Sequence, residues 1–142
     1  MKAERALLIG TALTLLAIGT LVYITCRPET LRLFGWADRL GLGHFVKSTR
    51  ENFSSLGSWL PPWFINSAPF ALWVASYVLL VRSIWAGTKG FARTAWLLPI
   101  PFIAVIAELG QMISLVPGTF DFFDLAFVIC ATIIAMFLPN KT

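Results

Sequence analysis

The feature that most constrains this chain is a long stretch near its beginning that contains no charged residue. The stretch runs from Ala6 to Cys26, and Lys2 and Arg5 precede it. A helix needs about 20 mainly apolar residues to cross the hydrocarbon core of a bilayer, and this stretch is long enough. It is also longer than the apolar core of a cleaved signal peptide, and no A-x-A site follows it. It therefore predicts a transmembrane helix.

The composition indicates that a bilayer surrounds the rest of the chain as well. Hydrophobic residues make up 58% of the 142 residues and charged residues only 13%, against roughly 45–50% and about 25% in soluble domains. So few charges cannot cover a soluble surface, which excludes cytosolic globular and disordered proteins. The net charge of +4 comes without a dense Lys/Arg cluster, so we expect no nucleic-acid partner.

Three further apolar stretches predict three more membrane spans. Pro99 and Pro101 should kink the first half of the third span, and Pro117-Gly118 should turn the chain between the third and the fourth. The sequence thus predicts an all-α polytopic membrane protein that forms a single domain, 1–142. Its four transmembrane helices are expected over 6–26, 63–81, 94–116 and 121–139.

The connection between the first two spans, residues 27–62, has a helical pattern of its own. Apolar residues recur in steps of three and four on two faces separated at Gly41 and Gly43, which predicts two short amphipathic helices. Such helices would lie along the outer membrane surface or cap the spanning helices, or else form a lid or a surface through which lipid passes. The two faces consist of Leu33, Trp36, Ala37 and Leu40, and of Phe45, Thr49, Phe53, Leu56 and Leu60.

The distribution of cations predicts the orientation. Cytoplasmic segments beside a membrane carry an excess of Lys and Arg, and the cations are densest when the N-terminus and the C-terminus are both inside. The inner cations are then Lys2, Arg5, Arg82, Lys89, Arg93 and Lys141, and the outer ones, spread over the long connection, are Arg27, Arg32, Arg39, Lys47 and Arg50.

Three of the seven acidic residues lie within or at the edge of the third and fourth spans. Ionisable groups inside a membrane are costly and mark functional sites by default. Glu108 and Gln111 share a helix face, and Asp121 and Asp124 have the same spacing. Because a short turn makes the two spans antiparallel neighbours, these side chains should form a polar column that descends from the outer surface. Asn66 enters the second span from the same side and should join this binding pocket.

Several members of the column also have a purely structural interpretation. Asp121 is placed to cap the fourth helix, and Gln111 can hold helices together through its amide. No Lys or Arg lies at the depth of Glu108, which therefore needs a proton, a hydrogen bond or an exogenous cation. The outer cations within reach of the two aspartates are Arg27, Arg32 and Arg39.

The sequence does not identify an enzyme. It has no recognisable nucleophile, phosphate-binding glycine loop or metal-ligand set, so we expect no catalytic residue, no metal and no cofactor. Cys26 and Cys130 are the two cysteines, and His44 is the single histidine. An alternative is a membrane enzyme that acts on a lipid-linked envelope substrate, with Glu108 and Asp124 as acid and base or as Mg²⁺ ligands. A proton-coupled carrier ranks last, because no second acid lies in the cytoplasmic half.

The segment AELGQMISLVPGTFDFFDLAF, Ala107–Phe127, resembles the hallmark of VanZ-like membrane proteins. That family has a Glu followed three residues later by a Gln in one helix, then a short turn and a D-x-x-D pair that opens the last helix. Glu108, Gln111, Asp121 and Asp124 match these positions. Outside this segment the resemblance is one of hydropathy and of span number.

The resemblance implies a bacterial envelope protein of the inner membrane, and a link to resistance against glycopeptides of the teicoplanin type. Together with the acidic column, it leads us to expect a non-enzymatic protein whose outward-facing pocket binds an amphiphile, a lipid headgroup or a partner protein. The candidate partners beside the bilayer are an envelope lipid, a glycopeptide and another membrane protein, and self-association is left open.

Overall fold

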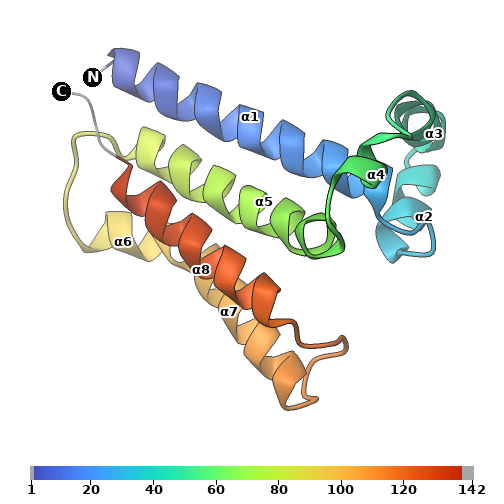
Figure 1. Ribbon diagram of the computed structural model, residues 1–142. Helices are drawn as coiled ribbons and strands as arrows, with labels where there is room; N and C mark the ends of the chain where they lie inside the picture. The colour runs from blue at the N-terminus through green and yellow to red at the C-terminus, as the bar shows by residue number, and fades with distance from the viewer. Residues whose placement is uncertain (1, 139–142) are drawn as a thin grey trace.

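The computed structural model describes residues 2–138, and over that range it contains helices and no strand (Figure 1). The predicted all-α class is therefore confirmed. The helices are α1 (Lys2–Cys26), α2 (Arg32–Arg39), α3 (Gly43–Asn52), α4 (Leu56–Trp59), α5 (Pro62–Ile84), α6 (Phe91–Leu97), α7 (Pro99–Met112) and α8 (Phe122–Phe137).

Two helices, α1 and α5, are long and apolar enough to cross a membrane. The pair α6 and α7 adds a third span if it is counted as one broken helix, because its two parts meet at a bend of 43°. Helix α8 is apolar but has only 16 residues, fewer than the about 20 that a span needs. Length and composition thus support two or three spans, and the fourth stays a prediction.

The predicted third span is divided and ends early. The break falls at Leu98, directly before Pro99, because Pro99 and Pro101 have no backbone N–H to continue the hydrogen bonds of α6. Helix α7 then stops at Met112, where the sequence predicted helix as far as Val116. Ser114 adopts a left-handed conformation (φ 58°), and the backbone N–H groups of the next two residues fold back to donate to the Gly110 carbonyl.

The predicted fourth span begins as expected, since Asp121 is the N-cap of α8. Its predicted end, Pro139, lies outside the described residues, as does Lys141 of the predicted cytoplasmic cations.

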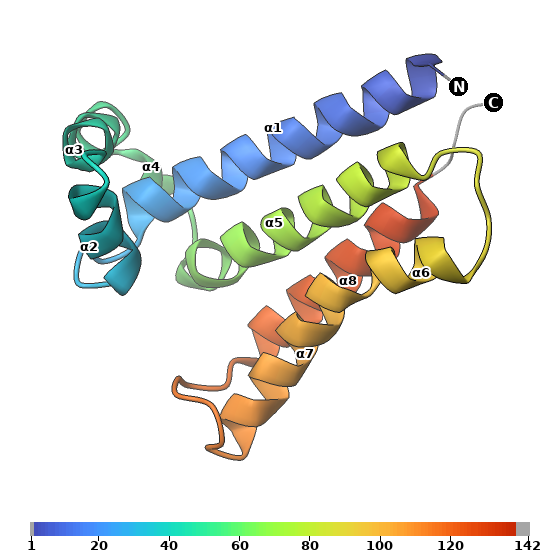
Figure 2. The ribbon, with the colours of Figure 1, turned by 180° about the vertical axis from the view of Figure 1, so that it is seen from behind.

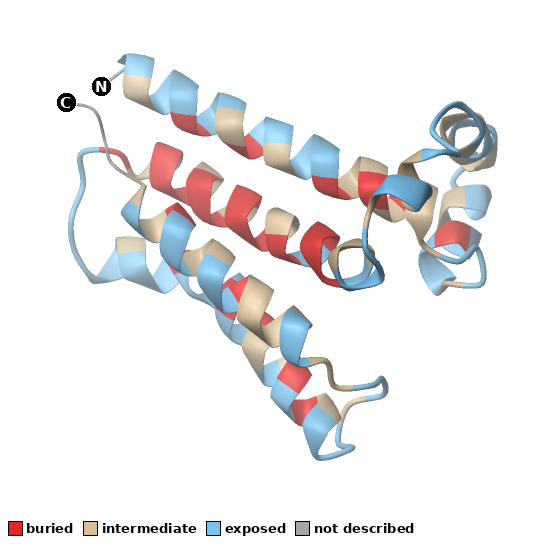
Figure 3. Ribbon diagram, in the orientation of Figure 1, coloured by how far each residue is buried: buried red, intermediate tan, exposed pale blue. Residues whose placement is uncertain are grey.

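Helix α5 is the centre of the packing, because it lies between α1 on one side and α8 on the other (Figures 1 and 2). Buried residues follow α5 along its length, whereas α1 and α8 have fewer of them (Figure 3). Val74, Val78 and Leu79 are at most 1% exposed. By contrast, Leu7, Leu13 and Ile18 of α1 are exposed, which is compatible with an apolar surrounding for the outer face of this helix.

Helices α1 and α5 approach most closely where a glycine lacks a side chain. A Cβ atom added to Gly19 would lie 3.0 Å from the Pro69 carbonyl oxygen and 3.0 Å from two ring atoms of Trp73. Trp73 is also fixed to α1 by a hydrogen bond from its Nε1 to the Thr20 hydroxyl (3.2 Å). Small residues at such contacts let helix backbones approach in membranes.

Replacement of Gly19 by leucine should therefore push α1 away from α5. We expect Gly19→Leu to lower the free energy of unfolding by about 1–3 kcal/mol, the usual cost of overpacking. Unfolding of the purified protein in detergent measures this loss. Gly10→Leu on the same helix is the matched control, because nothing lies within 4 Å of its added Cβ, and equal stability of the two variants would contradict the proposed close contact.

The first amphipathic helix predicted between α1 and α5 is α2. The second, whose apolar face was predicted from Phe45 to Leu60, is divided, because α3 ends at Asn52 and the short helix α4 follows. The predicted apolar face of α2 is not the buried one. Phe34 is 6% exposed, while Leu33, Trp36 and Leu40 are 41%, 58% and 76% exposed. On α3 the apolar Phe45 is also exposed. These faces thus leave apolar surface exposed near the end of α1.

Candidate functional site

A cavity of about 640 Å³ lies between α1, α5, α7 and the beginning of α8. Its volume falls within the range of roughly 300–1,000 Å³ that is typical of small-molecule sites. The α7–α8 hairpin diverges from α1 and α5 towards the end where this cavity is found (Figures 1 and 2). All five residues predicted for the binding pocket line it, namely Asn66, Glu108, Gln111, Asp121 and Asp124. We call it the acidic cavity.

Glu108 is the most deeply placed of the acids. Its side chain, on α7, is only 6% exposed, and its Oε2 atom is buried without a hydrogen-bond partner. The backbone N–H of Asp121 interacts with the same carboxylate, and the charges of Asp121 and Asp124 act on it. Buried polar atoms are rarely left unpaired, so Glu108 holds an acceptor that nothing in the described chain satisfies.

The two aspartates at the start of α8 differ in their hydrogen-bond partners. Asp121 Oδ1 accepts a hydrogen bond from the Phe123 backbone N–H (2.8 Å), so its helix-capping role is realised while it also lines the cavity. Asp124 lies in the first helical turn, and its Oδ1 is buried without a partner. The cavity therefore contains two carboxylates, Glu108 and Asp124, that each have an unused buried oxygen.

Gln111 is held against the turn that joins α7 to α8. Gly118 has φ 142°, and a Cβ atom at this position would lie 2.8 Å from the Gln111 side-chain amide. The turn therefore favours glycine for its backbone conformation, and a side chain at this position would displace the flexible end of Gln111. The Pro-Gly pair in the sequence predicts the turn, but nothing in the sequence indicates that the turn closes over Gln111.

One cation faces the acids among the described residues that line the cavity. Arg27, just after α1, donates from Nη1 to Asn66 Oδ1 (2.6 Å), and its guanidinium lies 5.8 Å from the Tyr23 ring centre. Its Nε atom is buried without a partner. Arg32 and Arg39, the other two cations that the sequence placed within reach, do not line the cavity.

Arg50 of α3 holds the end of α1 in place, a role that the sequence did not reveal. It donates to the backbone carbonyls of Ile24 and Arg27 and forms an ion pair with Glu29 (3.0 Å). These contacts fix the backbone at Arg27 and so position its side chain. In the sequence Arg50 is simply one polar residue of an amphipathic helix.

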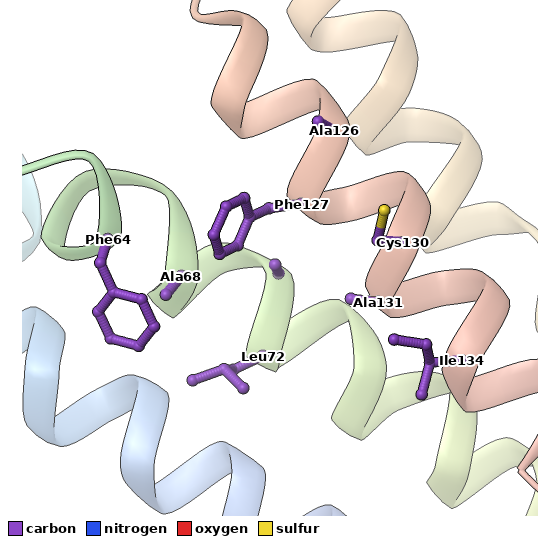
Figure 4. Close-up of a pocket in the computed structure, with 9 residues that line it drawn as sticks. Phe64, Ala68, Leu72, Ala126, Phe127, Cys130, Ala131 and Ile134 are labelled. Atoms are coloured by element: carbon purple, nitrogen blue, oxygen red, sulfur yellow. The ribbon is translucent and has the colours of Figure 1, made fainter.

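Two apolar cavities lie near the acidic one. A groove of about 340 Å³ between the end of α1 and helices α2 and α3 shares Tyr23 and Trp73 with the acidic cavity. We call it the α2–α3 groove. A third cavity of about 360 Å³ lies between α5 and α8, where Phe64, Phe127 and Cys130 are among the lining residues (Figure 4). Its lining is wholly apolar, so it offers no group that would orient a ligand.

Over residues 2–138 no group of three or more His, Cys, Asp or Glu side chains could hold a metal ion. The unpaired oxygens of Glu108 and Asp124 suit a ligand that donates hydrogen bonds or carries positive charge.

Comparison of the chain with models of protein families, with curated proteins and with solved structures found no match. The resemblance of Ala107–Phe127 to VanZ-like proteins therefore stays a prediction.

Proposed function

We propose that this chain is a VanZ-like protein of the bacterial inner membrane whose acidic cavity faces outward and binds the polar headgroup of an amphiphile. The observation that carries the proposal is the buried Glu108 carboxylate, which faces a cavity and has an oxygen with no partner. A link to resistance against teicoplanin-type glycopeptides follows from the resemblance alone and belongs to the proposal.

The proposed topology has four spans with both termini in the cytoplasm. At about 1.5 Å per residue, α8 is roughly 24 Å long, less than the about 30 Å of the hydrocarbon core. Local thinning of the bilayer accommodates a short span, and the acidic cavity at the start of α8 supplies polar surroundings there. The Lys and Arg residues near α1 and in the α5–α6 loop favour a cytoplasmic location for that end.

Thiol labelling in intact cells tests both parts of the proposal. The template carries Cys26→Ser and Cys130→Ser, and single cysteines are placed at Thr119, which lines the cavity, and at Lys89 in the α5–α6 loop. A membrane-impermeant reagent should label position 119 in intact cells and position 89 only after permeabilisation. A short-chain phospholipid should slow labelling at position 119 severalfold.

The reverse labelling pattern would invert the topology and remove the outward-facing site. Labelling at position 119 that no amphiphile slows would contradict binding in the cavity.

A further inference from the structure

On the basis of the proposed function, we infer that the ligand is an aminophospholipid, with its ammonium group on the carboxylates of the acidic cavity and an acyl chain in the α2–α3 groove. The inference rests on three features of the described residues: unpaired carboxylate oxygens, one unpaired guanidinium nitrogen, and an apolar groove that shares two lining residues with the cavity.

The acceptors select a cationic donor. An ionised carboxylate can only accept hydrogen bonds, and Glu108 Oε2 and Asp124 Oδ1 are both buried without a donor. Three carboxylates face one guanidinium across the cavity, because Arg27 is the one cation among its described lining residues. A primary ammonium brings three donors and a positive charge, whereas a purely anionic headgroup would be repelled by the carboxylates.

Arg27 indicates that the ligand also carries an anionic group. Its Nη1 is used by Asn66, but its buried Nε has no partner. Guanidinium groups bind phosphate through several parallel hydrogen bonds. A headgroup that carries an ammonium a few bonds away from a phosphate would satisfy the carboxylates and Arg27 together, as phosphoethanolamine does.

The α2–α3 groove adjoins the acidic cavity and suits the acyl chain. Tyr23 and Trp73 line both spaces, and their rings lie 5.1 Å apart. The groove is lined almost entirely by apolar atoms from α1, α2, α3 and α5, including the exposed Leu33, Trp36 and Phe45. A lipid whose phosphate lies at Arg27, beside Tyr23, would therefore have its chain directed along the exposed faces of the two amphipathic helices.

The test is a binding competition between three probes, monitored by native mass spectrometry of the full chain in detergent. The probes are dihexanoyl phosphatidylethanolamine, dihexanoyl phosphatidylglycerol and water-soluble phosphoethanolamine. We expect the ethanolamine lipid to bind at least tenfold more tightly than the glycerol lipid, and the soluble headgroup to bind at least tenfold more weakly than the ethanolamine lipid. The double variant Glu108→Gln/Asp124→Asn should abolish the preference for the amine, and the exposed control Glu51→Gln should retain it.

The outcomes separate this inference from the proposed function. Equal binding of the two lipids would overturn the ammonium assignment and leave amphiphile binding intact. Soluble phosphoethanolamine that binds as tightly as the lipid would overturn the groove assignment and identify a soluble amine as the ligand. Binding of none of the three probes would overturn the inference and count against the proposed function as well.

Discussion

Replacement of Arg82 by alanine is expected to lower the free energy of unfolding by roughly 3 kcal/mol or more. Arg82 is only 4% exposed, and its guanidinium donates to the Ala135 and Leu138 carbonyls at the end of α8. Hydrogen bonds to charged groups contribute about 1.5–3 kcal/mol each, and the loss of two would leave carbonyls of the last helical turn without donors. Denaturant unfolding of the purified protein in detergent measures the loss.

A matched control is Lys89→Ala, which removes an exposed cation from the α5–α6 loop and should leave stability within about 0.5 kcal/mol of the original. Arg82→Lys should lie between the two, because an ammonium keeps the charge but lacks the fork of the guanidinium. Arg82→Ala with unchanged stability would show that this contact between α5 and α8 contributes nothing.

Replacement of Glu108 by leucine is expected to have the opposite effect on stability. An unsatisfied buried polar group costs about 1–3 kcal/mol, and Glu108 Oε2 is such a group. Glu108→Leu should therefore raise the free energy of unfolding by about 1–3 kcal/mol while it abolishes ligand binding. A binding residue that is costly to the fold is the usual trade between stability and function, and the same denaturant unfolding detects the gain.

Two comparisons make this result specific. Gln111→Leu removes an amide from the same helix face. It should not raise stability, because Gln111 is not among the described residues that have a buried polar atom without a hydrogen-bond partner. A loss of stability in Glu108→Leu would show that Glu108 holds the helices together. Glu108 would then be a packing residue, and the main evidence that the acidic cavity is a binding site would be removed.

Much of this arrangement was predictable because it depends on local patterns. The long uncharged stretches locate α1 and α5, and steps of three and four residues locate α2 and α3. The shared helix face of Glu108 and Gln111, together with the turn before Asp121, is enough to predict that these side chains meet. A cluster that spans one hairpin needs only the helical period and a turn signal.

What the sequence did not reveal depends on contacts between distant segments. Arg82 looks like a cation that flanks a span, and its burial follows only from where α8 ends. Helix α7 ends early because of a left-handed Ser114, a conformation that few residues other than glycine adopt. The pairing of Arg27 with Asn66 joins residues 39 positions apart, and no local pattern selects Arg27 over Arg32 or Arg39.

The most direct test of the central claim is whether the protein retains an amphiphile when it is extracted from its membrane. Native mass spectrometry of the protein purified in mild detergent measures the bound mass. We predict that the unaltered protein and the exposed control Glu51→Gln carry one bound amphiphile, and that Glu108→Gln and Asp124→Asn, although folded, carry at least tenfold less. Equal retention by all four proteins, or retention by none, would contradict the assignment of the acidic cavity as a binding site.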